Sequence, residues 1–215
     1  MDKLVLHVGN KNYSSWSMRP WIAMTAAGID FEDVVIPFDF AAGNPEIRAI
    51  SPTGKVPLLC HGDMLVWESL AIIEYVAELF PDAGLWPSDR QARARARSYS
   101  MEMLSGFRAL RGACPMNIRR QKQALDVAED VRADVARIEE IWMEALSRSG
   151  GPFLFGSFCA ADAMYAPVVN RFDVYDLVAD RETLGYMERV KAHPAFGKWE
   201  EAARAEPWIV AEDEV

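Results

Sequence analysis

The neighbouring residues Glu68 and Ser69 have side chains that could hold both charged ends of an amino acid. The Glu68 carboxylate can accept hydrogen bonds from an ammonium group. Ser69 opens a predicted helix whose apolar residues keep helical spacing, and the unpaired N–H groups at a helix start attract a carboxylate. The pair therefore predicts a site for an amino-acid-like group such as γ-glutamyl, the alternative being an ordinary capped helix.

Val56 and Pro57 could bind the backbone of the same ligand. Pro57 heads an apolar strand and has no amide hydrogen, so it belongs at a strand start or edge. A cis Val56–Pro57 bond would turn the N–H and C=O of Val56 outward, where they can pair with an extended peptide as a further strand. Lys55 precedes the pair and could reach a carboxylate at the far end of that peptide.

Ser14, Ser15 and Ser17 lie where a helix over residues 16–27 is predicted to begin. A thiolate placed there meets hydroxyl donors and the positive end of the helix dipole, both of which lower a thiol pKa from about 8.5. A decrease of about two units requires roughly 2.7 kcal/mol, which one hydroxyl bond and the dipole can supply. Ser14 is the first candidate for the donor, Ser15 the second, and Tyr13 a rival; the alternative is that the serines only cap the helix.

The elements that would position these residues follow from hydrophobic spacing and turn signals. A strand is predicted over residues 4–8, a helix over 16–27 that stops at Gly28, and a short strand over 64–66 before the Ser69 helix. A turn-rich stretch over 81–88 then separates this strand-containing part from a helical remainder. The first helix of that remainder begins near Arg90 and is predicted to run to about Cys114.

Four segments resemble successive signatures of the cytosolic glutathione S-transferase superfamily, nearest to its serine-type zeta class: 13–23, 51–57, 68–75 and 159–162. The resemblance implies a thioredoxin-like domain of order β-α-β-α-β-β-α over residues 1–80, a linker over 81–88 and an all-helical domain over 89–215. It also implies a cytoplasmic homodimer that binds glutathione as co-substrate and acts in the detoxification of electrophiles.

The same resemblance assigns the residues derived above to parts of glutathione. Ser14, or else Ser15, would donate to the thiolate. The binding residues would be Lys55, Val56, Pro57, Glu68 and Ser69, with Val56 on the cysteinyl backbone and Lys55 at the glycyl carboxylate.

Trp16 departs from the zeta pattern, which has a cysteine at this position. The departure favours conjugation of glutathione to a small electrophile over glutathione-dependent cis-trans isomerisation of a diacid. No cysteine lies near the predicted thiol site, so disulfide exchange is not expected. A third reading is a binding module of the same fold without turnover.

The electrophile is expected to bind between the Ser14 loop and the first helices of the second domain. The residues expected in this pocket are Trp16, Met103, Phe107, Arg108, Arg111 and Arg171, with Pro115 and Met116 beside them. The resemblance places Arg171 where zeta enzymes present an arginine to a substrate carboxylate. The alternatives are that the Met and Phe residues are core and that Arg171 pairs with an internal carboxylate.

Cys159 stands where the family has a serine or threonine that begins a capping box with Asp162. We expect Asp162 to accept a hydrogen bond from the Cys159 amide. Because a thiol is a weak hydrogen-bonding group, the forward bond from Cys159 should be weak or missing.

The composition excludes several other classes of protein. A net charge of −9 over 215 residues argues against nucleic acid as a partner, because phosphate binding relies on clustered Lys and Arg. Three cysteines at no metal-like spacing predict neither a disulfide framework nor a zinc site. No apolar run is long enough to span a bilayer, and the first residues, Met1-Asp2-Lys3, lead into a strand without a signal-peptide pattern.

Overall fold

The first part of the chain forms a four-stranded mixed sheet of order β2-β1-β3-β4. The computed structural model describes residues 2–215, so Met1, with which the predicted first domain begins, lies outside the described residues. The central strand β1 (Leu4–Val8) pairs in parallel with β2 (Glu32–Val35) and antiparallel with β3 (Leu58–His61). The edge strand β4 (Met64–Trp67) pairs antiparallel with β3.

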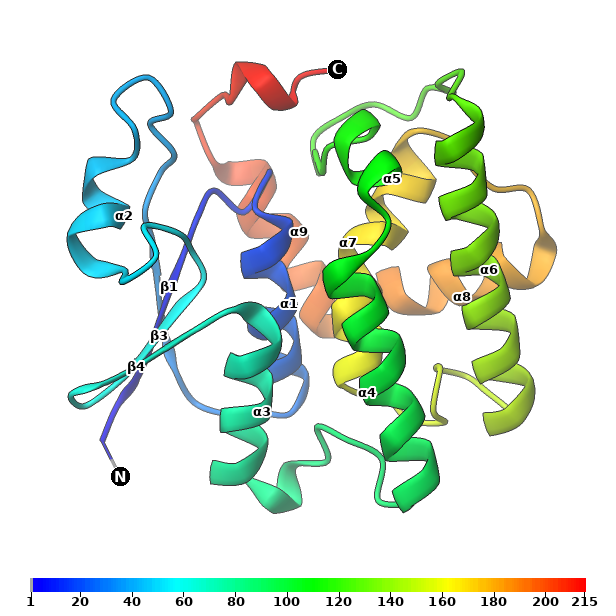
Figure 1. Ribbon diagram of the computed structural model, residues 1–215, viewed down its shortest axis with the longest axis horizontal. Helices are drawn as coiled ribbons and strands as arrows, with labels where there is room; N and C mark the ends of the chain where they lie inside the picture. Colours follow the sequence, from blue (N-terminus) through cyan, green and yellow to red (C-terminus); the bar gives the residue numbers. More distant parts are fainter. Residues whose placement is uncertain (1) are drawn as a thin grey trace.

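Three helices connect or follow these strands, namely α1 (Ser15–Ala26), α2 (Pro45–Ile50) and α3 (Ser69–Leu79). The element order is therefore β-α-β-α-β-β-α, which confirms the predicted thioredoxin-like arrangement. In β1 the fully buried residues alternate with half-buried ones, as expected for a strand with one face on the core. Helix α1 lies between the sheet and the helical part of the molecule (Figure 1), and most of its residues are buried for that reason.

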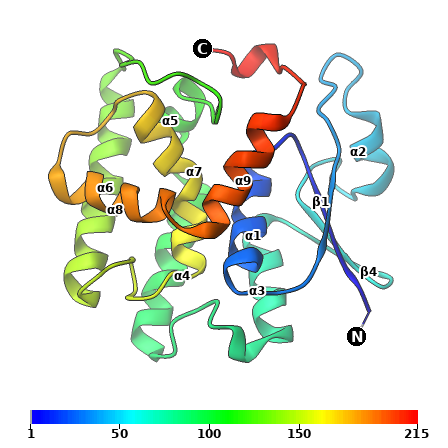
Figure 2. The same cartoon turned by 180° about the vertical axis from the view of Figure 1, so that it is seen from behind.

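The remainder of the described chain is helical. Its α-helices are α4 (Arg90–Ser105), α5 (Arg108–Ala113), α6 (Glu129–Ser149), α7 (Ala160–Val174), α8 (Arg181–Lys191) and α9 (Pro194–Ala205), with the short 3₁₀ turns η1 (Pro81–Ala83) and η2 (Ala211–Asp213). The view from behind shows α9 lying beside α1, and the C-terminal segment reaching the end of the molecule where α1 begins (Figure 2). The domain boundary at 81–88 stays a prediction.

The expectation of one helix from Arg90 to about Cys114 is wrong. The chain breaks at Gly106 and Phe107, which separate α4 from α5. Gly106 is extended, and a Cβ there would lie 2.8 Å from the Glu102 carbonyl oxygen. Phe107 then takes a φ of 54°, a left-handed conformation that ends helical hydrogen bonding. Beyond the break, Arg111 of α5 lies against the ring of Trp16 in the first turn of α1.

Helix α7 is the core of the helical part, because nearly all of its residues are buried. Asp162 in its first turn is fully buried and accepts hydrogen bonds from the Cys159 amide, the Leu154 amide and the Tyr186 hydroxyl, each at 3.0 Å. The predicted bond back to the Cys159 amide is confirmed. The Cys159 sulfur faces the Asp162 amide in the arrangement of a capping box, without the geometry of a side-chain cap hydrogen bond, which agrees with the expected weak forward bond.

Candidate functional site

Two adjoining cavities lie at the end of the molecule where α1 begins. The first, of about 220 Å³, is lined by Trp16, Thr53, Lys55, Val56, Pro57, Glu68, Ser69 and Arg111. The second, of about 260 Å³, is lined by Tyr13, Ser14, Ser15, Trp16, Phe38, Phe40, Asn44, Ile47, Gly54, Lys55 and Val56. Trp16, Lys55 and Val56 line both cavities, so the predicted peptide-binding residues and the predicted serines share one continuous site.

Val56 presents its main chain to this site. The Val56–Pro57 peptide bond is cis, and Val56 itself lies just outside β3. Within residues 2–215 neither the N–H nor the C=O of Val56 has a hydrogen-bond partner in the protein. Because main-chain groups are rarely left unpaired, this short edge is suited to an extended peptide.

Glu68 and Ser69 line the first cavity together with Val56. The Glu68 carboxylate is exposed and makes no hydrogen bond or ion pair among the described residues. Its backbone has a φ of 68° and a ψ of 126°, a conformation that costs a residue other than glycine about 1–3 kcal/mol. Ser69, 1% exposed, begins α3, and its hydroxyl oxygen is buried without a partner. The first N–H groups of α3 and an unsatisfied hydroxyl therefore lie together beside an unpaired carboxylate.

Ser14 and Ser15 stand at the start of α1, beside the second cavity. Ser14 is the N-cap, and its oxygen accepts a long 3.4 Å hydrogen bond from the Ser17 amide. The Ser14 hydroxyl donates to the Ser17 hydroxyl oxygen at 2.7 Å, and that oxygen also accepts from the Gly9 amide at 3.1 Å. Ser15 is the first residue of the helix, and within residues 2–215 its hydroxyl has no hydrogen-bond partner. Both serines can present a donor to a ligand, Ser15 directly and Ser14 by rotation of its hydroxyl.

Trp16 lines both cavities and contacts both parts of the chain. Its ring lies against two guanidinium groups, with the Arg19 carbon 4.2 Å and the Arg111 carbon 4.6 Å from the ring centroid. Arg19 is completely buried and donates to the carbonyls of Met164 and Ser15. Burial and the neighbouring arginines lower the pKa of the Arg19 guanidinium, and burial lowers that of Arg111. Cation–π contact compensates part of this desolvation.

The other residues predicted for the electrophile pocket line neither cavity. Met103 and Phe107 belong to the hydrophobic core, and Arg108 is exposed. Arg171 is 4% exposed, and its Nε donates to the Cys114 carbonyl at 2.7 Å. Burial lowers the pKa of Arg171 to about 10. The structure therefore brings only Trp16 and Arg111 of this set to the two cavities.

The aromatic wall of the second cavity, which consists of Phe38 and Phe40, was not predicted from the sequence. Phe38 and Phe40 follow β2 and stack with ring centroids 5.2 Å apart. Phe40 is 48% exposed, which is a large apolar surface for a loop residue. Two aromatic residues at i and i+2 between Pro37 and Gly43, in a segment with turn residues, were the available signal. Among residues 2–215 there is no cluster of His, Cys, Asp and Glu able to hold a metal ion, and no helix long and apolar enough to cross a membrane.

Comparison with known sequences identifies relatives along most of the chain. The family model described as "Glutathione S-transferase, N-terminal domain" matches residues 13–79. Maleylacetoacetate isomerase of Rattus norvegicus is 30% identical over 180 residues, which cover 80% of this chain and 81% of the relative. Probable maleylacetoacetate isomerase of Caenorhabditis elegans is 32% identical over 123 residues, and glutathione S-transferase 1 of Dianthus caryophyllus is 33% identical over 128 residues. In each of these two cases the match spans 56% of the relative's length. It covers 57% of this chain for the Caenorhabditis elegans protein and 58% for the Dianthus caryophyllus protein.

Comparison with solved structures identifies the same fold. A glutathione transferase homologue from Burkholderia BGR1, solved with bound glutathione, has a TM-score of 0.73 at 24% identity, over 96% of this chain and 100% of that one. Glutathione transferase Omega 2S from Trametes versicolor has a TM-score of 0.71 at 22% identity, over 96% and 98%. Because both identities are below 25%, this similarity shows the fold alone.

Proposed function

Because the chain belongs to the glutathione S-transferase family, we propose that it binds glutathione as co-substrate and activates the thiol for attack on a small electrophile. The observation that carries this proposal is the joining of two cavities at Val56 and Trp16. One cavity contains the unpaired groups of Val56, Glu68 and Ser69, and the other contains the serines at the start of α1.

The first cavity has a partner for each polar part of glutathione. The Glu68 carboxylate would accept from the γ-glutamyl ammonium group, and the buried Ser69 hydroxyl with the first amides of α3 would bind the γ-glutamyl carboxylate. The unpaired main chain of Val56 would bind the cysteinyl backbone, and Lys55 would lie near the glycyl carboxylate. The buried Ser69 oxygen without a partner supports this fit, since a buried hydroxyl is normally hydrogen-bonded.

The cysteinyl sulfur of a ligand bound in this way would point to the start of α1. There Ser14 or Ser15 would donate to the thiolate, and the thiol proton would pass to solvent. The ionised sulfur then forms the bond to the electrophilic carbon, while the leaving group departs with its electron pair. The stacked pair of Phe38 and Phe40 provides an apolar wall for an electrophile.

Isomerisation of a diacid stays the second candidate, because two of the relatives are named maleylacetoacetate isomerase. That reaction would use Arg171 at a substrate carboxylate. In this chain the Arg171 guanidinium is instead buried against the Cys114 carbonyl, and Trp16 fills the space beside the serines. Both features support the transferase reading.

Calorimetry of glutathione binding and ultraviolet titration of the bound thiol test the proposal together. We expect binding, and a thiol pKa about two units below the reference of about 8.5, followed by turnover with at least part of a panel of small electrophiles. Binding with an unshifted thiol pKa would identify a binding module without turnover. Absence of binding would reject the proposal.

We further propose that the protein is a cytoplasmic homodimer with its domain boundary at 81–88. The three cysteines are all free thiols, which suits a reducing compartment. Exposed apolar side chains on β4 and α4 offer a surface for the second copy.

A further inference from the structure

The loop that leads into the serines is held by residues from the far end of the chain. The Glu206 carboxylate accepts the Lys11 amide at 2.7 Å through one oxygen and the Asn12 amide at 3.1 Å through the other. Glu206 is 9% exposed, and Lys11 and Asn12 are also buried. Since a carboxylate is an acceptor only, it suits two consecutive N–H donors that water cannot reach.

Three further polar groups of Lys11 and Asn12 also bond to the helical part of the chain. The Lys11 carbonyl accepts from the Trp199 indole at 2.9 Å. The Asn12 side chain accepts from the Arg119 amide at 2.9 Å and donates to Asn117 at 3.0 Å. None of these three bonds is local, so the conformation of the loop at Lys11 and Asn12 depends on contacts with the helical part.

Arg119 fixes Glu206 in turn. Its guanidinium donates to the carbonyl oxygens of Glu206 and Trp208, both at 2.6 Å, and to the Tyr13 hydroxyl at 2.9 Å. The Tyr13 hydroxyl donates to Glu214 at 2.5 Å. The segment after α9 is therefore tied to the residue directly before Ser14.

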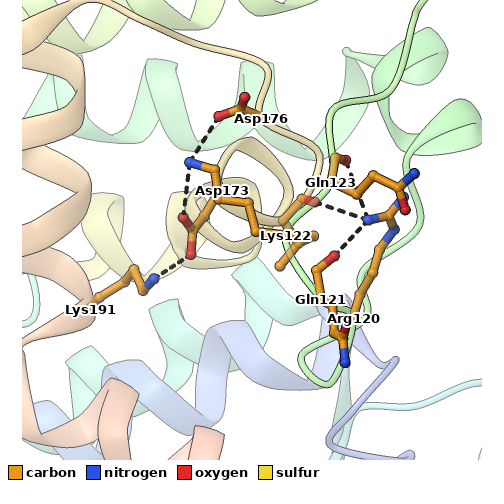
Figure 3. A network of polar contacts seen from close by, with 8 residues as sticks. Arg120, Gln121, Lys122, Gln123, Asp173, Asp176 and Lys191 are labelled. Carbon is orange, nitrogen blue, oxygen red and sulfur yellow. Dashed lines mark hydrogen bonds and ion pairs between the residues drawn. The ribbon is translucent and has the colours of Figure 1, made fainter.

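The segment that carries Asn117 and Arg119 is itself anchored to the end of α7 and the residues that follow it. Arg120 donates to the Val174 carbonyl at 3.1 Å, and Lys122 pairs with Asp176 at 2.8 Å. Lys122 and Lys191 also approach the same Asp173 carboxylate (Figure 3). Arg119 thus belongs to a segment that is held at Asn12 on one side and at the end of α7 on the other.

We propose that Glu206 is a positioning residue for the serine that activates the thiol, a role that rests on the proposed function. Its two bonds fix Lys11 and Asn12, and the Asn10 carbonyl accepts the amides of Tyr13 and Ser14 to close the turn. Ser14 is therefore presented by a turn whose backbone is set from the C-terminal segment. Loss of one acceptor oxygen would let the turn shift and displace Ser14 from the thiol. A small displacement of a group that contacts the reacting atoms lowers the reaction rate.

Glu206→Gln tests this role because the side chain keeps its length and loses one of its two acceptor oxygens. The NH₂ group of the glutamine would face one of the two main-chain N–H groups, and two donors cannot form a hydrogen bond with each other. We expect the bound thiol pKa to rise by about half a unit to one unit and kcat to fall about tenfold, with KM for glutathione within about threefold. Hydrogen exchange of the Lys11 and Asn12 amides should accelerate.

Two further variants separate positioning from a loss of stability. Glu200→Gln removes a half-buried carboxylate of α9 whose partner among residues 2–215 is Arg204, and should change none of these quantities. Glu206→Asp keeps the charge on a shorter side chain and should restore part of the thiol pKa and kcat. The inference is overturned if Glu206→Gln leaves the thiol pKa and kcat unchanged, or if activity falls only in proportion to the unfolded fraction. Wild-type protein that binds no glutathione would overturn the proposed function, and this inference with it.

Discussion

Ser14 and Ser15 differ in what their hydroxyl groups do before a ligand arrives. The Ser14 hydroxyl already donates to Ser17, and a thiolate would draw that hydrogen away because a charged acceptor is stronger than a neutral one. The Ser14 oxygen caps α1 only through a long bond to the Ser17 amide. Removing it should therefore affect ionisation of the ligand more than stability of the helix.

Ser14→Ala should raise the pKa of bound glutathione thiol by about one to two units, because only the charged form loses its donor. The affinity for glutathione measured at a pH where the thiol is protonated should stay within a few-fold. Ultraviolet titration of the complex measures the first quantity and calorimetry the second. Ser15→Ala is the matched control; a pKa that moves in Ser15→Ala and not in Ser14→Ala would transfer the role to Ser15.

Glu68 combines a strained backbone with an unpaired carboxylate, so two substitutions separate its two properties. Glu68→Ala and Glu68→Gly should both weaken glutathione binding by about 2 kcal/mol or more, through loss of a charge-assisted hydrogen bond. Only Glu68→Gly should also stabilise the fold, by about 1 kcal/mol, because glycine adopts a φ of 68° without steric cost.

Calorimetry and denaturant unfolding measure the two effects at Glu68. Glu78→Ala, at an exposed position on the same helix, is the control and should leave both quantities unchanged. Undiminished glutathione affinity in Glu68→Ala would remove Glu68 from the site.

The candidate binding residues that the sequence predicted as adjacent pairs line one cavity in the structure. In Val56–Pro57 the proline indicates an outward-facing main chain. In Glu68–Ser69 a carboxylate precedes the first residue of a helix. Each pair is therefore recognisable from two neighbouring residues. Glu206 could not be predicted in this way, because the residues it contacts lie 195 and 194 positions away. A glutamate near a helix end has no local pattern that indicates such contacts.

At the scale of elements, predictions from hydrophobic spacing succeeded where one face of an element is buried. The predicted strand over residues 4–8 matches β1, and the helix predicted from Ser69 matches α3. The prediction failed between α4 and α5. There the break depends on the extended Gly106 and the left-handed Phe107, and apolar spacing alone continues through both residues.

The start of α7 should make stability depend on pH in a particular direction. Burial raises the pKa of Asp162 from 3.8 to about 6, so the folded state binds this proton more tightly than the unfolded chain. The stabilisation is fully present below about pH 4 and is lost as pH rises through about 6. Each pKa unit corresponds to about 1.4 kcal/mol.

Comparison with Asp162→Asn isolates this contribution, because other titrating groups cancel in the difference. The free energy of unfolding of the wild-type protein, minus that of Asp162→Asn, should increase as pH is lowered from 7 to 5. Denaturant unfolding at several pH values measures this difference. A difference that decreases over this range would show that the hydrogen bonds to Asp162 outweigh its desolvation.

At the scale of the whole molecule, the site depends on contacts between the sheet-containing part and the helical part. Arg19 from α1 donates to the Met164 carbonyl in α7, and Arg97 of α4 forms a two-point ion pair with Glu74 of α3 at 2.8 Å. Local patterns predicted each part separately. They did not predict that Trp16 would lie between Arg19 and Arg111, because that arrangement exists only after the two parts have packed together.

The homodimer can be tested on the exposed apolar residues of β4 and α4, which lie on either side of α3 (Figure 1). Met64, Trp67 and Met101 are 55%, 40% and 53% exposed. Burying one such side chain fully is worth about 1.5–3 kcal/mol, and a two-fold interface counts each substitution twice. Met101→Glu should therefore raise the dimer dissociation constant by at least about 100-fold.

Analytical ultracentrifugation over a range of concentrations measures this dissociation constant. Ile209→Glu is the control, because Ile209 is 74% exposed on the C-terminal segment, away from β4 and α4. Since a C2 interface is self-complementary, Trp67→Glu should weaken association as Met101→Glu does, even though the two residues lie on different elements. A wild-type protein that sediments as a monomer at all concentrations would contradict the proposed homodimer. A dimer that both variants leave intact would place the interface on another face.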